Sequence, residues 1–442
     1  MERIFEFLRV DDIPLLARRN YVREVGYFAL WTVVLGTVEG NIAAIVVKKT
    51  FGASNWLTTV VWQAPIFMMT LNLFWGLAIR GRRRLRLLVA LTVCAALLIG
   101  SIALAAPTWK PWGGWVFAAQ IGLTHLFVTG LVTLQASIWK LNYPHSHRGR
   151  IVGRLQTVRF LTVPIAGATV ATLFDWNPDC YRYLYPGMAA VALLSLLPLR
   201  GFRVRGEWRE RRPPGSGAGA DRSAGRGLGG LRTGLREAVG ILRQDVRFRD
   251  YMLAQFTLGS ANFFTEPVLI TVLTGQLLLG YFASNLLMQV IPGILVWVSI
   301  RFWARHFDRV GVLRFRVGNS LVWAAAFACI AAGTLTVDSA GAVQLGAALG
   351  LIGLGRVLYG AAHGGGTIAW NIGHLDFARE QQIDLYMSIH VALTGVRALV
   401  MPHLGLLANR WLGNGSFALA VVVSLAAYLL FRRLAQTEAP AA

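Results

Sequence analysis

The sequence predicts an all-α membrane protein with 12 transmembrane helices arranged in two six-helix, pseudo-symmetric bundles. Three observations lead to this prediction: an apolar composition, a series of apolar spans of helical length, and a repeat across the midpoint of the chain. Of the 442 residues, 55% are hydrophobic and 14% are charged, and the mean hydropathy is +0.53. A chain with so few polar residues cannot cover a water-soluble globule of this size, so it belongs in a membrane.

The apolar spans match the thickness of a bilayer, which a helix of about 20 residues can cross. Spans six and twelve are the shortest. The predicted spans are residues 25–47, 56–78, 87–106, 114–139, 152–174, 183–199, 252–275, 281–300, 317–336, 343–369, 386–408 and 416–431.

The second half of the chain repeats polar residues of the first half. Glu39 recurs as Glu266 after 227 positions, and Arg159 recurs as Arg397 after 238 positions. The other matches are Pro65 with Pro292, Val158 with Val396, Leu161 with Leu399, Pro164 with Pro402 and Gly167 with Gly405. Because each repeat places an acid or an arginine inside an apolar span, it indicates a polar pathway shared by two membrane-embedded bundles.

The net charge of +22 comes from arginines that gather in loops on one side of the predicted spans. The positive-inside rule then places these loops and both termini in the cytoplasm. The loops follow spans two, four and eight and contain Arg80, Arg82, Arg83, Arg84 and Arg86, then Lys140, Arg148, Arg150 and Arg154, then Arg301, Arg305, Arg309, Arg314 and Arg316. Topology and anionic lipid headgroups account for this charge, so nucleic acid is not an expected partner and membrane lipid is. The excess of arginine over lysine is typical of a high-GC bacterial genome, which favours a bacterial inner membrane.

One change of composition divides the chain. We predict an N-terminal six-helix bundle at 1–200 with an interfacial segment at 1–24, an arginine-rich cytoplasmic linker at 201–249, and a C-terminal six-helix bundle at 250–442. The middle of the linker is rich in Gly, Ser and Pro and is expected to be disordered. Its end, 235–248, has the spacing of an amphipathic helix on the inner leaflet, or equally of an ordinary solvated helix.

No pattern in the chain predicts enzymatic chemistry. The glycines of the linker lack the Lys-Ser/Thr ending of a phosphate-binding loop, and His363 with the three glycines that follow it lacks a nucleophile elbow. The 3 cysteines form no disulfide or metal pattern. We therefore expect no catalytic residues, no metal and no cofactor.

A loop after span eight carries the strongest family signal. Asp308, Arg309, Gly311 and Arg314 resemble the Asp-Arg-x-Gly-x-x-Arg/Lys signature of the major facilitator superfamily. The 12 spans, the six-plus-six repeat and the central linker also resemble this family over nearly the whole chain. The resemblance implies a cytoplasmic gate in which the acid latches the two halves together. The alternative is a solvated loop salt bridge worth under about 1 kcal/mol.

The matching loop of the first half departs from the signature. It keeps Gly76 and the basic cluster that starts at Arg80, but it has no acid where the second half has Asp308. The resemblance therefore implies that the second half carries most of the latch.

Two further segments resemble the family's antiporter signature, Gly-Pro-x-x-Gly-Gly. They are Pro164 with Gly167 in span five and Pro402 with Gly405 in span eleven, although both lack the first glycine. A proline inside a helix frees a backbone carbonyl and allows a bend, and a glycine admits a neighbouring helix. These four residues are the predicted hinges, and they favour antiport.

Charged residues inside the spans are the candidate pathway. A charge at the bilayer centre costs roughly 2.5 to 3.5 kcal/mol on insertion scales, so each must pair, protonate or face water. If the family fold holds, span one packs near span five and span seven near span eleven, which predicts ion pairs of Glu39 with Arg159 and of Glu266 with Arg397. Such pairs can instead be static contacts that fix helix packing.

Spans four and ten line the cavity in the resembled family and add three candidates. Arg356 suits an anionic substrate group or a third place beside Glu266. His125 and His363 are candidates for substrate or proton handling, and the alternative for each is a hydrogen-bonded packing role.

These features predict a secondary active transporter that moves a small anionic or zwitterionic molecule across the bacterial inner membrane by alternating access. We expect a monomer, with the proton as coupling ion and with efflux by antiport favoured. The alternative is a membrane scaffold or receptor that keeps this fold without transporting.

Overall fold

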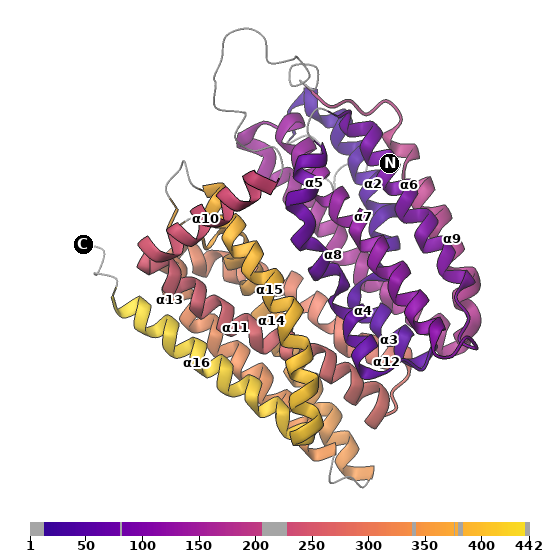
Figure 1. The fold of residues 1–442 in the computed structure, drawn as a ribbon, viewed down its shortest axis with the longest axis vertical. Helices are drawn as coiled ribbons and strands as arrows, with labels where there is room; N and C mark the ends of the chain where they lie inside the picture. Colours follow the sequence, from indigo (N-terminus) through magenta and orange to yellow (C-terminus); the bar gives the residue numbers. More distant parts are fainter. Residues whose placement is uncertain are drawn as a thin grey trace. The chain divides into compact units, whose positions relative to one another are not determined.

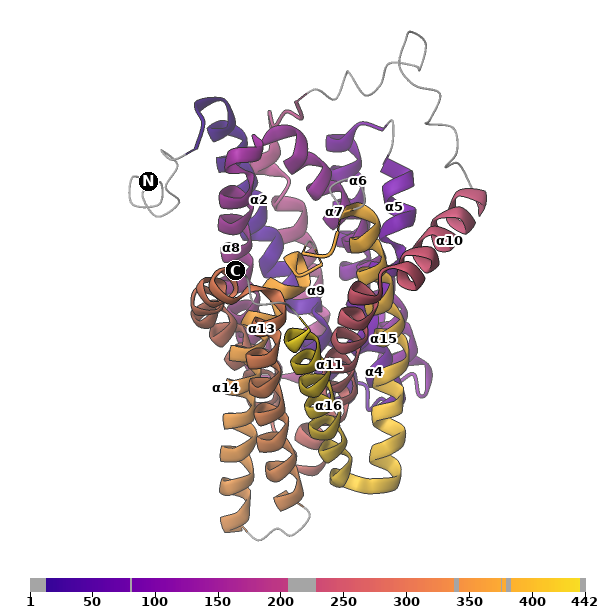
Figure 2. The same cartoon turned by 90° about the vertical axis from the view of Figure 1, so that its left-hand side faces the viewer.

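The computed structural model describes residues 13–79, 82–205, 228–337, 342–374, 376–378 and 383–437. These residues form helices joined by short turns, and no strand occurs among them (Figures 1 and 2). The prediction of an all-α membrane protein is confirmed. Within the described ranges, 9 helical stretches are long and apolar enough to cross a membrane, so the chain is a multi-pass membrane protein.

The predicted spans coincide with these helices. Two of the stretches, 281–337 and 389–436, each contain two predicted spans. The span predicted at 56–78 lies on α4 (Asn55–Met68) and α5 (Asn72–Ile79), which a 3-10 turn, η2 (Met69–Leu71), joins. The total of twelve spans stays a prediction.

The first half contains the following helices besides α4 and α5. They are α2 (Leu15–Val38), α3 (Gly40–Lys49), α6 (Arg84–Ser101), α7 (Trp112–Asn142), α8 (His145–Trp176) and α9 (Tyr181–Leu194), with short 3-10 turns η3 (Ile102–Leu104), η4 (Pro178–Cys180) and η5 (Leu197–Leu199). Apolar faces hold this part together, because α6 packs against both α7 and α9, and α2 packs against α8.

The second half contains longer helices and two π-helical turns. They are α10 (Leu228–Gln244), α11 (Val246–Thr271), η6 (Val272–Gln276), α12 (Tyr281–Asn285), η7 (Leu286–Val290), α13 (Ile291–Val337), α14 (Ala342–Ile372), α15 (Ile383–Leu412) and α16 (Ser416–Gln436), with a 3-10 turn, η9 (Gly413–Gly415), before α16. Gly311 interrupts α13 with φ +73°, a left-handed conformation that glycine adopts without strain. Spans eight and nine lie on either side of it.

The chain falls into two compact units. Unit 1 is Met1–Arg211 with Leu269–Ile294, and unit 2 is Arg212–Val268 with Leu295–Ala442. Residues 269–294, which the predicted boundaries assign to the second bundle, pack within unit 1 against α3 and α8. Sequence position therefore assigns residues 269–294 to the second half, whereas packing assigns them to unit 1.

Repeated glycines bring helix backbones together in each unit. In unit 1, a Cβ atom at Gly36 would lie 2.8 Å from the Val163 carbonyl oxygen, and one at Gly167 would lie 3.4 Å from the Gly36 oxygen. In unit 2, a Cβ atom at Gly405 would lie 2.2 Å from the Phe264 oxygen. The prediction that Gly167 and Gly405 admit a neighbouring helix is confirmed.

The predicted first bundle begins with a helix and ends in a 3-10 turn where the structure describes it. Residues 1–12 and 206–227, which include the predicted interfacial start and the linker's middle, lie outside the described residues. From Leu15 onward the chain already belongs to α2, and Ala17, Tyr21 and Glu24 are buried. The helix predicted at 235–248 begins earlier, as α10 from Leu228.

Candidate functional site

The first transmembrane helix is broken at an acidic residue. α2 ends at Val38 and α3 starts at Gly40, while Glu39 between them has an extended backbone with φ −57° and ψ 148°. Gly40 lets α4 approach the break closely, because a Cβ atom at this position would lie only 2.4 Å from the Trp62 carbonyl oxygen. Discontinuous helices of this kind present backbone groups and side chains to substrates in transporter folds.

The carboxylate of Glu39 forms the predicted ion pair with Arg159 of α8. The Arg159 Nη2 atom lies 2.9 Å from the Glu39 Oε1 atom, and the two side chains are 36% and 24% exposed, respectively. His125 of α7 donates from Nε2 to the Val38 carbonyl oxygen at 2.9 Å. His125 is therefore a hydrogen-bonded residue that supports the break in the helix.

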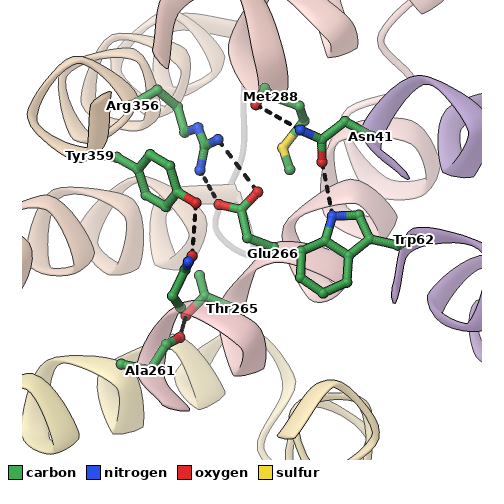
Figure 3. Close-up of polar contacts among 9 residues, drawn as sticks. Asn41, Trp62, Ala261, Thr265, Glu266, Met288, Arg356 and Tyr359 are labelled. Atoms are coloured by element: carbon green, nitrogen blue, oxygen red, sulfur yellow. Dashed lines mark hydrogen bonds and ion pairs between the residues drawn. The ribbon is translucent and has the colours of Figure 1, made fainter. Parts of the chain in front are cut away.

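Asn41 joins the break to two other elements of unit 1. Its Oδ1 atom accepts a hydrogen bond from the Trp62 indole at 2.8 Å, and its Nδ2 atom donates to the Met288 carbonyl oxygen of η7 at 3.2 Å (Figure 3). The polar group next to Glu39 is thus held in one orientation by α4 and by a π-helical turn.

The second acid, Glu266 of α11, pairs with an arginine of α14 inside unit 2. Both nitrogens of the Arg356 fork donate to the Glu266 carboxylate, with Nη2 at 3.4 Å from Oε2 (Figure 3). The side chains of Arg356 and Glu266 are 0% and 3% exposed. Tyr359 covers the guanidinium, with its ring centroid 3.9 Å from Cζ, and donates to Asn262 at 2.8 Å.

The predicted pair of Glu266 with Arg397 is wrong. Arg397 instead donates to the backbone oxygens of Gln255 and Phe256 at 3.0 and 3.5 Å. Glu266 lies ten residues beyond Phe256, which is about 15 Å along α11. Arg397 lies against α11 because Gly259 has no side chain: a Cβ atom there would be 2.1 Å from the Arg397 Nη1 atom.

The first half cannot accommodate its arginine in the same way. The residue equivalent to Gly259 at the first offset is Thr32, whose hydroxyl lies 2.5 Å from that of Thr162 and fills the space. Arg159 therefore extends to Glu39. In both units the carboxylate of the first helix is retained, while the cation comes from the fifth helix in one case and the fourth in the other.

A second buried acid was missed. Glu24 of α2 is 4% exposed and accepts hydrogen bonds from the indole of Trp139 on α7 and from the hydroxyl of Tyr143, the residue that follows α7. Among the described residues these neutral groups are its only hydrogen-bond donors. Glu24 lies one residue before the predicted span 25–47, so hydropathy assigned it to an interfacial segment.

Another set of contacts without a sequence signature joins α8 to α12 in unit 1. Asp175, near the end of α8, accepts the backbone N–H groups of Tyr281 and Phe282 at 2.6 and 2.7 Å and so caps α12. Lys49 of α3 donates to the Leu279 carbonyl oxygen at 2.7 Å and lies 5.0 Å from the ring centroid of Tyr281. We call these contacts the α8–α12 latch.

The predicted gate residues show no ion pair. Asp308, Arg309 and Arg314 are exposed around Gly311, and no hydrogen bond or ion pair joins them to another described residue. Gly76 lies in α5. Arg80 lies outside the described residues, so the gate stays a prediction.

The remaining candidates lie in helix interiors. Pro164 and Pro402 are internal to α8 and α15, and their role as hinges stays a prediction. His363 of α14 packs between aromatic rings, with centroid distances of 6.1 Å to Trp323 and 5.9 Å to Tyr359.

The apolar helices, with ion-paired acids and arginines enclosed among them, define a polytopic membrane protein. No family model and no curated protein matches the sequence. Among solved structures, a D-xylose–proton symporter is 17% identical, with 94% of this chain and 96% of that chain covered and a TM-score of 0.63. A POT family transporter in complex with 5-aminolevulinic acid is 13% identical, with 97% and 100% covered and a TM-score of 0.64. A variant of the nucleoside transporter NupG is 12% identical, with 95% and 99% covered and a TM-score of 0.60.

At these identities the likeness establishes the fold. The chain shares the fold of these solved transporter structures.

Proposed function

We propose that this protein is a secondary active transporter that moves a small molecule across the bacterial inner membrane by alternating access. The observation that carries the proposal is the Glu39–Arg159 ion pair, which lies at a break in a transmembrane helix and is partly exposed. Breaks of this kind at the membrane midplane form substrate and ion sites in transporters. The match of the whole chain to transporter structures supports the same conclusion.

Exposure assigns the two ion pairs different roles. The Arg159 and Glu39 side chains are 36% and 24% exposed, so a substrate can compete for either partner. The Arg356 and Glu266 side chains are 0% and 3% exposed, so their pair serves the packing of unit 2. Arg159 would bind a carboxylate or phosphate group, and Glu39 would bind an amine, which fits an anionic or zwitterionic substrate.

Proton coupling follows from the same site. A substrate anion that takes Arg159 from Glu39 leaves a carboxylate without its cation inside the membrane, where protonation is less costly than an isolated charge. A D-xylose–proton symporter among the matched structures supports coupling to protons. The partial motif of Pro164 and Gly167 favours efflux by antiport, in which proton and substrate move in opposite directions. The matched D-xylose–proton symporter moves both in the same direction.

Alternating access requires contacts that break in one state. We assign this role to the α8–α12 latch, because it joins helices of the first half to a segment from the second half of the sequence. Asp308 and the arginines near Gly311 would act at the cytoplasmic end.

Transport by the purified, reconstituted protein tests the proposal. A thermal-shift screen of the detergent-solubilised protein against metabolite libraries supplies candidate substrates, and proteoliposomes loaded with each candidate then report counterflow. We expect counterflow of at least one stabilising compound, lost in R159Q and retained in R410Q, an exposed arginine control. If no stabilising compound crosses the membrane and the protein copurifies with a stable partner, the scaffold alternative replaces transport.

A further inference from the structure

Unit 2 encloses a set of two arginines and two histidines, separate from the Glu266–Arg356 pair. Arg316 of α13, Arg397 and His390 of α15, and His374 after α14 are 2%, 5%, 2% and 4% exposed. We call these four residues the basic cluster.

Direct contacts and electrostatics join the members of the basic cluster. Gln255 bridges the two arginines, because Arg316 donates to its side-chain oxygen and Arg397 donates to its backbone oxygen at 3.0 Å. The rings of His374 and His390 stack with centroids 6.2 Å apart and 13° between their planes. His390 interacts electrostatically with both arginines and with His374.

No ion pair joins the basic cluster to an acid among the described residues. Asp376, two residues beyond His374, is exposed and acts electrostatically on Tyr251, which also interacts with Arg316. The other partners of its guanidiniums are neutral: Arg316 donates to Asn319 at 3.0 Å, and Arg397 faces the ring of Phe263 at 5.0 Å. The nearby acid Asp245 already accepts hydrogen bonds from Phe248 and Tyr386. The buried guanidinium of Arg356, by contrast, forms an ion pair with Glu266.

Several buried nitrogens of the cluster also lack a hydrogen-bond partner. They are the Nε atoms of Arg316 and Arg397, Nδ1 of His374 and both ring nitrogens of His390, and a neutral imidazole offers one of its two nitrogens as an N–H donor. Buried charges without a counter-ion and buried donors without an acceptor both cost folding free energy. An anion with several acceptor oxygens would remove both costs.

We propose that the basic cluster binds a small oxyanion of the phosphate or carboxylate class. The guanidinium groups supply the charge and fork-shaped donors that such oxyanions prefer. Burial lowers the pKa of His374, so the two arginines carry most of the binding at neutral pH. A phospholipid headgroup offers the same chemistry, but side chains that are at most 5% exposed favour a free anion over one attached to acyl chains. This site does not depend on the proposed transport.

Direct binding of radiolabelled inorganic phosphate to the full-length protein in detergent tests the proposal. We expect saturable binding that chloride at matched ionic strength does not displace. R316Q and R397Q should each weaken it by at least about tenfold, the loss expected for a charge-assisted hydrogen bond. R301Q, at an exposed position of the same helix, should bind as the wild type does. R159Q, at the proposed transport site, should keep the binding that R316Q and R397Q lose.

Two further variants and one competitor keep the test decisive. If R316Q does not fold, R316K replaces it, because lysine keeps the charge and loses the fork, and it should bind phosphate more weakly. Absence of saturable binding to the wild type overturns the proposal. So does an equal loss in R159Q, or displacement by phosphatidylglycerol at concentrations where free phosphate has no effect.

Discussion

At the scale of single residues, three acids inside the membrane are held by three kinds of donor. A buried guanidinium neutralises Glu266, a partly exposed guanidinium neutralises Glu39, and an indole and a phenol hold Glu24. Removing a partner from a buried pair strands a charge away from water, whereas a partly exposed partner can be solvated. Neutralising an acid should therefore cost more free energy of unfolding when its ion pair is buried than when the pair is partly exposed.

We predict that E266Q lowers the free energy of unfolding by about 3 to 5 kcal/mol, because it leaves the Arg356 charge buried without a partner. The double variant E266M/R356M should recover much of this loss. Chemical unfolding in mild detergent measures both. E39Q is the matched control, and a loss in E39Q as large as that in E266Q would refute the distinction between the pairs.

The position of Arg397 depends on one missing side chain. G259A should destabilise unit 2 by about 1 to 3 kcal/mol, because its methyl group would overlap the Arg397 guanidinium. The same substitution at Gly350, where a Cβ atom meets nothing within 4 Å, should leave stability unchanged or raise it by up to about 1 kcal/mol. Thermal unfolding of both variants in one detergent tests the pair. Equal changes in stability for the two variants would show that helix propensity, and not overlap with the Arg397 guanidinium, determines the effect of G259A.

At the scale of elements, the functional features coincide with interruptions of helices. Glu39 separates α2 from α3, π-helical turns adjoin both ends of the segment that contains α12, and Gly311 divides α13. Neighbouring side chains bind backbone groups at two helix ends: His125 binds the Val38 oxygen, and Asp175 binds the N–H groups at the start of α12.

The α8–α12 latch leads to a prediction about local stability. D175A removes the acceptor of two N–H groups, and the loss of a helix N-cap typically costs about 1 kcal/mol. Amide hydrogen exchange at Tyr281 and Phe282 should therefore quicken by roughly fivefold. D179A is the control, because Asp179 is exposed and its carboxylate caps no helix. Unchanged exchange in D175A would show that α12 is held by packing alone.

The sequence predicts the elements better than it predicts their interruptions. Hydropathy locates the helices because about 20 apolar residues are needed wherever a bilayer is crossed. It does not mark the break at Glu39 or the π-helical turns, because these depend on a carbonyl or a side chain contributed by another helix. Gly311 is the exception, since a glycine within a loop signature already indicates an unusual backbone conformation.

The repeat predicts one ion pair correctly and the other incorrectly for a local reason. The acids and the fifth-helix arginines do recur, but Thr32 in one half and Gly259 in the other decide where the guanidinium lies. Glu24 was missed because it lies just outside a predicted span. Residue types at fixed offsets thus indicate which charges enter the membrane, and packing decides how they pair.

At the scale of the whole molecule, transport coupled to protons makes a specific demand on Glu39. If protonation of Glu39 alternates with its ion pair to Arg159, a neutral glutamine removes coupling but not the path for substrate. E39Q proteoliposomes should therefore still exchange an identified substrate that carries no amine by counterflow, yet fail to accumulate it under a pH gradient. E24Q is the necessary comparison, because Glu24 is buried, accepts hydrogen bonds from neutral groups, and is the rival proton site. Loss of accumulation in E24Q but not in E39Q would move the coupling site to Glu24.

Wild-type transport that is insensitive to both the pH gradient and the membrane voltage would exclude proton coupling at either acid, because neither carboxyl would then change its proton occupancy during the cycle.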